Sequence, residues 1–437
     1  MKKIAYLMLF TMLVFLSCKK DKTVKVHSVT VQLAYPATSS LTVTADVVVK
    51  LTGKGTSFEA KTNVEGKAIF NVPTDIYEVS ATDSRSNSGS AFIYNGVKSN
   101  VAIVDGWSAD NVIKLDLIES KTSQIVIKEL FMGGTPADDT GVFNYDRYVV
   151  LYNNSNTAAN LDNLCLATVA PYNAQLTNNA YYGADGKLTY ENENWMPAGQ
   201  AIWYFQKNVV VEPGKQIVIA LANSLNNTIT YSKSVNLNNA AYYATYDLAS
   251  FDHAATYRVA GENIPTDHYL KTVKYGTGAA WALSNTSPGF FIFNPQNTTP
   301  VAFGNDVSQT STITGYVSRK VPTSWIVDGV ESYLLNNSNN KKRFLPSVDA
   351  GYVYHVNGNG YSLYRNVDEQ ATKAIAGNEQ KLVHNYQFGT TAVGGTTDPS
   401  GIDAEASIRN GARIIYKDTN NSTNDFHLRS RASLRTN

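Results

Sequence analysis

Residues 43–51 read VTADVVVKL, in which every second residue is apolar. The apolar row consists of Val43, Ala45, Val47, Val49 and Leu51. Thr44, Asp46 and Lys50 fall between them, and this period of two is typical of a half-buried antiparallel strand. The stretch therefore predicts a β-sheet that packs one face on a core.

The same alternation continues downstream in short segments separated by turns. Residues 53–55 (GKG) and 63–66 (NVEG) read as turns, and the segments 58–62, 68–72 and 77–81 read as strands. Strands at this spacing predict a β-sandwich over residues 24–118. The segments 49–53 (VKLTG), 62–68 (TNVEGKA) and 72–77 (VPTDIY) resemble the prealbumin-like, carboxypeptidase-regulatory-type sandwich, which implies a spacer or docking domain.

A second β-rich domain is expected over residues 124–437. Its strands include 124–131 (QIVIKELF), 146–155 (DRYVVLYNNS) and 211–220 (VEPGKQIVIA). Their order resembles the lamin-tail-type, immunoglobulin-like sandwich, although Arg147 and Val150 stand where that family often carries acids. We therefore expect an all-β chain of tandem β-sandwich domains, the second of which carries long insertions such as residues 166–211.

The N-terminus predicts export and a lipid anchor. Lys2 and Lys3 precede an apolar core that is too short to span a bilayer, and Ser17-Cys18 follows it. This pattern resembles the lipobox of bacterial lipoproteins, which implies that residues 1–17 are a signal peptide, Cys18 carries the lipid and residues 18–23 form a tether. The alternative is an ordinary signal peptide with an incidental cysteine. We expect an outer-membrane protein exposed at the cell surface, and Asp21 in the tether does not by itself distinguish the inner face from the outer.

Composition excludes several classes of protein. Charged residues make up 17% of the chain and the net charge is +1, so no basic surface for nucleic acid is expected. Aromatic residues reach 11%, which argues against disorder. With Cys18 lipidated, Cys165 has no disulfide partner, and its neighbours Leu164 and Leu166 indicate a buried, inert thiol.

The sequence carries no common catalytic signature, neither a zinc-protease motif nor a nucleophile elbow nor a phosphate loop. The pairs Asp252-His253 and Asp267-His268 are adjacent in sequence, but neighbours on a strand point to opposite faces. Residues 418–422 (DTNNS) resemble the start of a calcium loop but lack its glycine and its final glutamate. We therefore expect no enzyme activity, no metal and no cofactor.

Aromatic residues are concentrated between Tyr172 and Tyr204, with 7 in 33 residues. Tyr and Trp offer rigid contact area at low entropic cost and stack on planar ligands or sugar rings. A ligand- or partner-binding surface is thus expected at Tyr181, Tyr182, Tyr190, Trp195 and Trp203. The alternative, weighed equally, is that they cap the core. A second cluster that could line the same surface contains Tyr242, Tyr243, Tyr246 and Phe251.

The second domain also resembles a Bacteroidota lipoprotein family known as domain of unknown function 4876. The resemblance rests on residues 127–131 (IKELF), 151–155 (LYNNS), 281–284 (WALS), 316–320 (YVSRK) and 418–426 (DTNNSTNDF). It implies an accessory protein of a TonB-dependent transporter that binds a ligand or caps the channel. The alternatives are a surface adhesin without a transport role and a hydrolase whose site carries no known motif.

Overall fold

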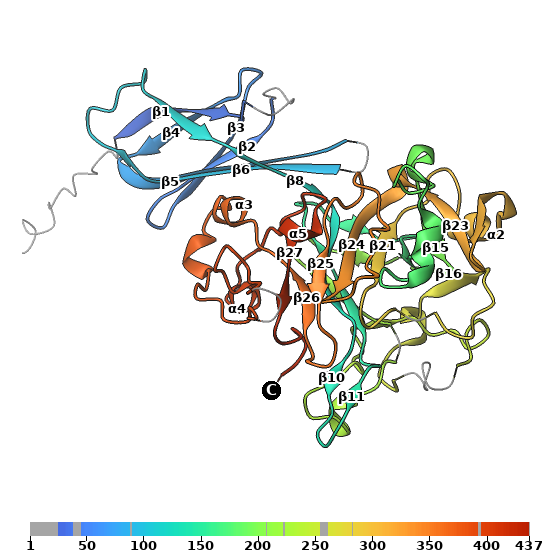
Figure 1. Cartoon of the computed structure of the whole chain (residues 1–437). Coiled ribbons are helices and arrows are strands. Elements are labelled where there is room, and N and C mark those ends of the chain that lie inside the picture. Colours follow the sequence, from blue (N-terminus) through green and yellow to red (C-terminus); the bar gives the residue numbers. More distant parts are fainter. Residues whose placement is uncertain are drawn as a thin grey trace, which may run out of the picture. The chain divides into compact units, whose positions relative to one another are not determined.

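Figure 1 shows the computed structural model of the chain, which describes residues 25–37, 45–87, 90–206, 208–221, 223–253, 261–281, 283–391 and 395–436. The predicted signal peptide, Cys18 and the predicted tether lie outside these ranges. Strands dominate and helices are short, so the expected all-β class is confirmed. None of the helices in the described ranges has the length and apolar character to cross a membrane. The chain forms two compact units, which are described separately.

The first unit contains residues 45–80 and 98–115 together with the first strand. One sheet has the order β4-β1-β7, and the other has the order β3-β2-β5-β6-β8. β1, β2, β4 and β7 bury alternate residues, as the sequence predicted. The strands are β1 (Val26–Ala34), β2 (Val48–Thr52), β3 (Ser57–Lys61), β4 (Lys67–Pro73), β5 (Asp75–Asn87), β6 (Ser90–Ile103), β7 (Val112–Asp116) and β8 (Ile118–Ser123).

The alternation in residues 43–51 is confirmed in phase but not in length. Val47, Val49 and Leu51 are buried, as expected for one face of a strand. However, Asp46 has a φ of 68°, a left-handed turn conformation, so the strand follows that turn and β2 begins at Val48. Residues 43 and 44 lie outside the described ranges.

The second unit contains residues 35–37, 81–97 and 116–436 among those described, so β8 belongs to it and β5 and β6 contribute to both units. That residues 24–118 fold alone stays a prediction. Two six-stranded sheets form the centre of this unit, with the orders β19-β18-β12-β9-β26-β27 and β20-β16-β14-β21-β24-β25. Their facing side chains form one core that includes Ile127, Leu151, Leu166, Ile292 and Val330. This is a sandwich in which the expected strand 124–131 appears as β9.

The bounds of the strands in the second unit are as follows: β9 (Ile125–Phe131), β10 (Thr135–Pro136), β11 (Val142–Phe143), β12 (Tyr148–Asn153), β13 (Ala159–Asn160), β14 (Cys165–Thr168), β15 (Trp195–Gly199), β16 (Ala201–Tyr204), β17 (Val210–Val211), β18 (Gln216–Ala220), β19 (Tyr243–Ala244), β20 (Lys271–Lys274), β21 (Gly289–Phe293), β22 (Thr310–Ile313), β23 (Tyr316–Pro322), β24 (Ile326–Leu334), β25 (Val353–His355), β26 (Ser362–Arg365) and β27 (Phe426–Arg429). Its helices are α2 (Pro300–Asn305), α3 (Glu369–Lys373), α4 (Ala404–Arg409) and α5 (Ser422–Asp425).

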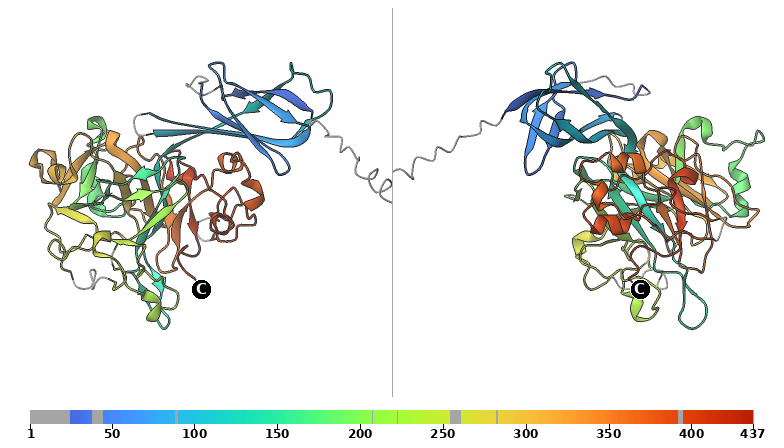
Figure 2. Two further views of the ribbon diagram at one scale, coloured as in Figure 1. Left: turned by 180° about the vertical axis from the view of Figure 1, so that it is seen from behind. Right: turned by 90° about the vertical axis from the view of Figure 1, so that its left-hand side faces the viewer.

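The insertion between residues 166 and 211 is not an irregular loop. It contains two 3-10 turns, Leu176–Tyr181 and Glu191–Glu193, and the strands β15 and β16. β15 pairs with β23 in a small sheet, and β16 lies between β14 and β20 in the second large sheet. Figure 2 shows from two further directions that this segment belongs to the body of the second unit. The length of the insertion is therefore explained by structural elements.

Candidate functional site

The aromatic residues predicted as a binding surface lie mostly in the core. Tyr190 and Trp203 are 0% exposed, Tyr181 is 2% exposed and Trp195 is 8% exposed. Tyr182 is the one half-buried member of the set. The expectation that this insertion exposes its aromatic side chains is therefore wrong, and the structure supports the alternative in which they cap the core.

Arg343 explains why these aromatics are held inside. Its guanidinium lies 3.7 Å from the ring centroid of Tyr181, and its Nη1 donates to the carbonyl of Pro171 at 2.9 Å. The hydroxyl of Tyr190 donates to the carbonyl of Arg343, a residue 153 positions away in the chain. The ring of Tyr190 in turn packs 4.8 Å from that of Trp195. Contacts with Arg343 therefore hold the insertion against a segment that is distant in the sequence, and the local sequence pattern does not predict these contacts.

The second aromatic cluster is only partly exposed. Phe251 is buried, whereas Tyr242, Tyr243 and Tyr246 are half-buried. His268 stacks on Tyr243 at 4.3 Å, and its Nδ1 lies 3.0 Å from the carbonyl oxygen of Tyr242. A backbone carbonyl therefore orients His268.

The remaining sequence candidates do not assemble into a catalytic or metal site. Asp252 and His253 are both exposed. Asp418 accepts a hydrogen bond from the backbone N–H of Ser123 at 2.6 Å, so the calcium-like segment is used in a structural turn. Within the described ranges, no three His, Cys, Asp or Glu side chains come together as metal ligands would.

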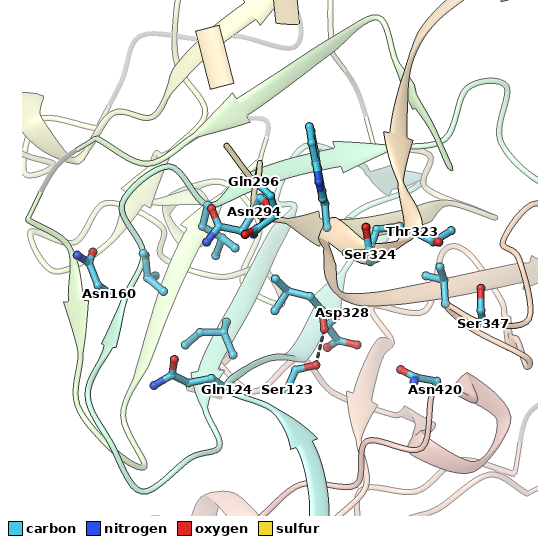
Figure 3. A pocket seen from close by; sticks show the side chains of 17 residues that line it. Ser123, Gln124, Asn160, Asn294, Gln296, Thr323, Ser324, Asp328, Ser347 and Asn420 are labelled. Carbon is cyan, nitrogen blue, oxygen red and sulfur yellow. Dashed lines mark hydrogen bonds between the residues drawn. The ribbon is translucent and has the colours of Figure 1, made fainter. Parts of the chain in front are cut away.

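A cavity of about 330 Å³ lies in the second unit, and no sequence motif pointed to it. It is lined by residues from 123–125, 160–164, 294–296, 323–328 and 347–348 and by residue 420. Figure 3 shows labelled side chains from all of these segments gathered around one space. Most of them are neutral amides and hydroxyls, and the volume falls at the lower end of the range of roughly 300–1,000 Å³ for small-molecule sites.

Trp325 supplies the aromatic wall of this cavity. It closes the 3-10 turn Thr323–Trp325 immediately before β24, and its side chain is half-buried. The indole packs against Phe303 of α2 with ring centroids 5.2 Å apart, which fixes the orientation of Trp325. Trp195, Trp203 and Trp281 are at most 8% exposed, so among the tryptophans of the second unit Trp325 alone presents ring surface to a ligand. The sequence gave no indication of this role, because Trp325 is a single aromatic residue outside any recognised motif.

Several polar side chains that line the cavity are available to a ligand. The hydroxyls of Thr323, Ser324 and Ser347 and the carboxamides of Asn294 and Asn420 have no hydrogen-bond partner among the described residues. A hydroxyl and a carboxamide can each donate and accept. The lining therefore matches a ligand that carries many groups of the same mixed character, and it offers no unpaired charge.

Asp328 is the one ionisable side chain in the lining, and other groups already engage it. Its carboxylate accepts from the backbone N–H of Ile127 at 2.6 Å and from that of Gly329 at 2.7 Å, and it also pairs with the guanidinium of Arg365. Burial raises the pKa of Asp328 to about 7, while the positive charge of Arg365 opposes this effect. We therefore interpret Asp328 as a structural link between β24 and β26.

Comparison with known proteins finds a family model that is similar to part of this chain. The model of the family DUF4876, a protein of unknown function, matches residues 212–381. The crystal structure of a DUF4876 family protein from Bacteroides thetaiotaomicron has a TM-score of 0.67 at 19% identity, and the alignment covers 92% of this chain and 94% of that chain. That similarity shows the fold.

A second solved structure, a candidate carbohydrate binding protein from Bacteroides uniformis, aligns with a TM-score of 0.15 and 13% identity over 70% of this chain and 98% of that one. This similarity is too low to inform fold or function. No curated protein matches the chain. The prealbumin-like and lamin-tail-like resemblances stay predictions. The resemblance to domain of unknown function 4876 is confirmed, since residues 212–381 match that family and the chain shares the fold of a crystallised member.

Proposed function

We propose that this protein is a non-enzymatic binding protein, lipid-anchored in the outer membrane, that captures a neutral, hydroxyl-rich ligand in the Trp325 cavity for a TonB-dependent transporter. The observation that carries the proposal is the combination of one half-buried indole with unpartnered hydroxyls and carboxamides around one cavity. Carbohydrates are the ligands with this chemistry, because a sugar ring has an apolar face that stacks on an aromatic ring and an edge of hydroxyls. Residues 294–296, 323–328 and 347–348 lie within the segment that matches the family model.

The composition of the cavity favours binding over catalysis. No His, Cys or Lys is among the described residues that line it, and its one carboxylate is paired with Arg365. A general base must reach the proton that it abstracts and must be free to accept it. Asp328 is not free in this sense, because two backbone N–H groups and a guanidinium already occupy its oxygens.

The anchor is supported by the sequence, and the transporter partner is implied by the resemblance to domain of unknown function 4876. Cys18 follows a short apolar core and Ser17, the pattern from which a lipid anchor is expected. A Cys18→Ala variant should move from the membrane fraction to the soluble envelope fraction. If the variant stays in the membrane fraction, the anchoring proposal is wrong. A transporter partner would be recovered with the wild-type protein after mild crosslinking in whole cells.

The binding proposal is tested with neutral disaccharides, namely maltose, cellobiose and mannobiose, titrated into the full chain carrying Cys18→Ala. Binding should quench the tryptophan emission and raise the unfolding temperature, because a ligand that binds only the folded state stabilises it. Trp325→Ala should weaken the binding by about 2 kcal/mol or more, as aromatic anchors commonly do.

The matched control is Trp107→Ala, which removes a half-buried tryptophan from the first unit. This variant should bind as the wild type does. Binding that survives in Trp325→Ala, or that is lost equally in Trp107→Ala, would refute the assignment of the site.

A further inference from the structure

A second cavity of about 620 Å³ lies beside the first within the second unit. Its aromatic lining consists of Tyr204, Phe205, Tyr243 and His268. Tyr243 and His268 are stacked with their rings 12° from parallel, and Phe205 packs edge-on against Tyr243 at 5.5 Å. These contacts fix the orientation of the aromatic wall.

The polar lining of the second cavity is similar to that of the first. The hydroxyls of Tyr204 and Tyr243 and the carboxamides of Asn163 and Asn208 have no hydrogen-bond partner among the described residues. Asp267 and Lys271 also line the cavity. These two opposite charges leave the lining neutral overall, so it also matches a neutral, hydroxyl-rich ligand.

The turn at residues 160–164 separates the two cavities. Leu161 and Leu164 line the first cavity, whereas Asn163 lines the second. Asn163 has a left-handed φ of 65°, which turns the chain between its two neighbours. Because adjacent Cα atoms lie about 3.8 Å apart, the two walls are neighbours in space.

The backbone couples the two walls directly. The N–H of Leu161 in the first cavity donates to the carbonyl of Val209 in the second at 2.8 Å. The N–H of Val209 donates in return to Oδ1 of Asp162 at 3.2 Å. These two hydrogen bonds brace the turn 160–164, which we call the ridge, and residues of this turn line both cavities.

We propose that the two cavities are subsites of one site for an extended neutral glycan, whose chain crosses the ridge 160–164. This inference rests on the proposed function and adds that the carbohydrate ligand is an extended chain. An oligosaccharide held in the first cavity presents its next units to the second at a high effective concentration, so the second contact adds affinity at little entropic cost. A disaccharide that fills the first cavity leaves no further sugar unit for the second.

The test compares short and long members of one glycan series by isothermal titration calorimetry with the full chain carrying Cys18→Ala. The probes are maltose with maltohexaose, cellobiose with cellohexaose, and mannobiose with mannohexaose. For the series that binds, the hexasaccharide should bind at least ~10-fold more tightly than the disaccharide. Tyr243→Ala should reduce the hexasaccharide affinity to that of the disaccharide and leave the disaccharide affinity unchanged.

Two further variants keep the result interpretable if Tyr243→Ala is unstable. Glycine adopts the left-handed backbone conformation of Asn163 without strain, so Asn163→Gly removes only the carboxamide on the ridge. This variant should bind the hexasaccharide several-fold more weakly and bind the disaccharide as the wild type does. The control is Tyr246→Ala. Tyr246 is a half-buried tyrosine close to Tyr243 in sequence that packs on Tyr269 and lines neither cavity, so this variant should bind both probes as the wild type does.

The outcomes separate this inference from the proposed function. If disaccharide and hexasaccharide bind equally and only Trp325→Ala weakens them, the extended site is refuted and the single-cavity function stands. If Tyr243→Ala and Asn163→Gly both leave the hexasaccharide affinity unchanged, the extended site is refuted as well. If none of the series binds, or Trp325→Ala changes nothing, the proposed function itself is refuted.

Discussion

Replacing Tyr190 with alanine should destabilise the second unit severely, although Tyr190 lies in a segment that reads as a loop. Its ring is fully buried, and truncating a buried Phe or Trp to Ala costs about 3–5 kcal/mol. The variant also removes the hydroxyl that donates to the carbonyl of Arg343 and leaves that carbonyl unpaired, which adds about 1 kcal/mol or more. A total of about 4–6 kcal/mol is a large part of the 5–15 kcal/mol that typically separates folded from unfolded protein.

The assay is differential scanning calorimetry, following the transition of the second unit. At about 2 °C per kcal/mol for a domain of this size, Tyr190→Ala should lower the unfolding temperature by roughly 8–12 °C. Tyr190→Phe keeps the ring and should lose only about 1–3 kcal/mol. Tyr172→Ala is the control, since that side chain is 38% exposed and should change stability by less than about 0.5 kcal/mol. Equal unfolding temperatures for Tyr190→Ala and Tyr172→Ala would refute the burial of this segment.

Three further results are expected from buried groups. Burial raises the pKa of the Cys165 thiol, so a Cys18→Ala protein should show no thiol reactive toward Ellman's reagent until it is unfolded, and reaction in the native state would contradict this. Arg365→Met leaves Asp328 as an unpaired buried acid and should cost about 3–5 kcal/mol, measured as a lower urea midpoint, whereas adding Asp328→Asn should restore part of the loss. Burial lowers the pKa of His427 to about 3, so between pH 6.5 and about 3 the unfolded protein binds a proton at His427 that the folded protein does not. The free energy of unfolding should therefore fall with decreasing pH more steeply in the wild type than in His427→Gln, by up to about 1.4 kcal/mol per pH unit. Equal slopes would refute this.

The fold class was predictable because local patterns determine it. The period of two that ends at Leu51 places Val49 and Leu51 on a buried face, and the apolar run 125–131 is β9, a strand with every residue buried. Strand starts were less predictable. Asp46 adopts a left-handed conformation within an alternating pattern that gives no sign of a turn.

The candidate site was not predictable, for a physical reason. A segment rich in tyrosine and tryptophan can belong to a core or to a binding surface, and the sequence of the segment alone does not distinguish the two. Contacts with residues far along the chain, such as Arg343, place these side chains in the core. The Trp325 cavity is built from six short segments spread over residues 123–420. The calcium-like pattern at residues 418–422, which includes Asn420, gave no indication of this cavity. The side chains of Asn294, Ser347 and Asn420 matter because no described residue hydrogen-bonds with them, a property that depends on the complete fold.

The strand order of the first large sheet dictates when the second unit can be completed as the chain emerges. β9 pairs with β12 on one side and with β26 on the other, and β26 pairs with β27 near the end of the chain. Ser433 then donates its backbone N–H to the buried carboxylate of Glu129 on β9 at 2.9 Å. A chain that emerges N-terminus first therefore holds β9 with an open hydrogen-bonding edge until β26 arrives, and β26 keeps an open edge until β27 arrives. Open edges of this kind recruit foreign strands, so the interval between the emergence of β12 and that of β27 is when this sheet is most exposed to pairing with another chain.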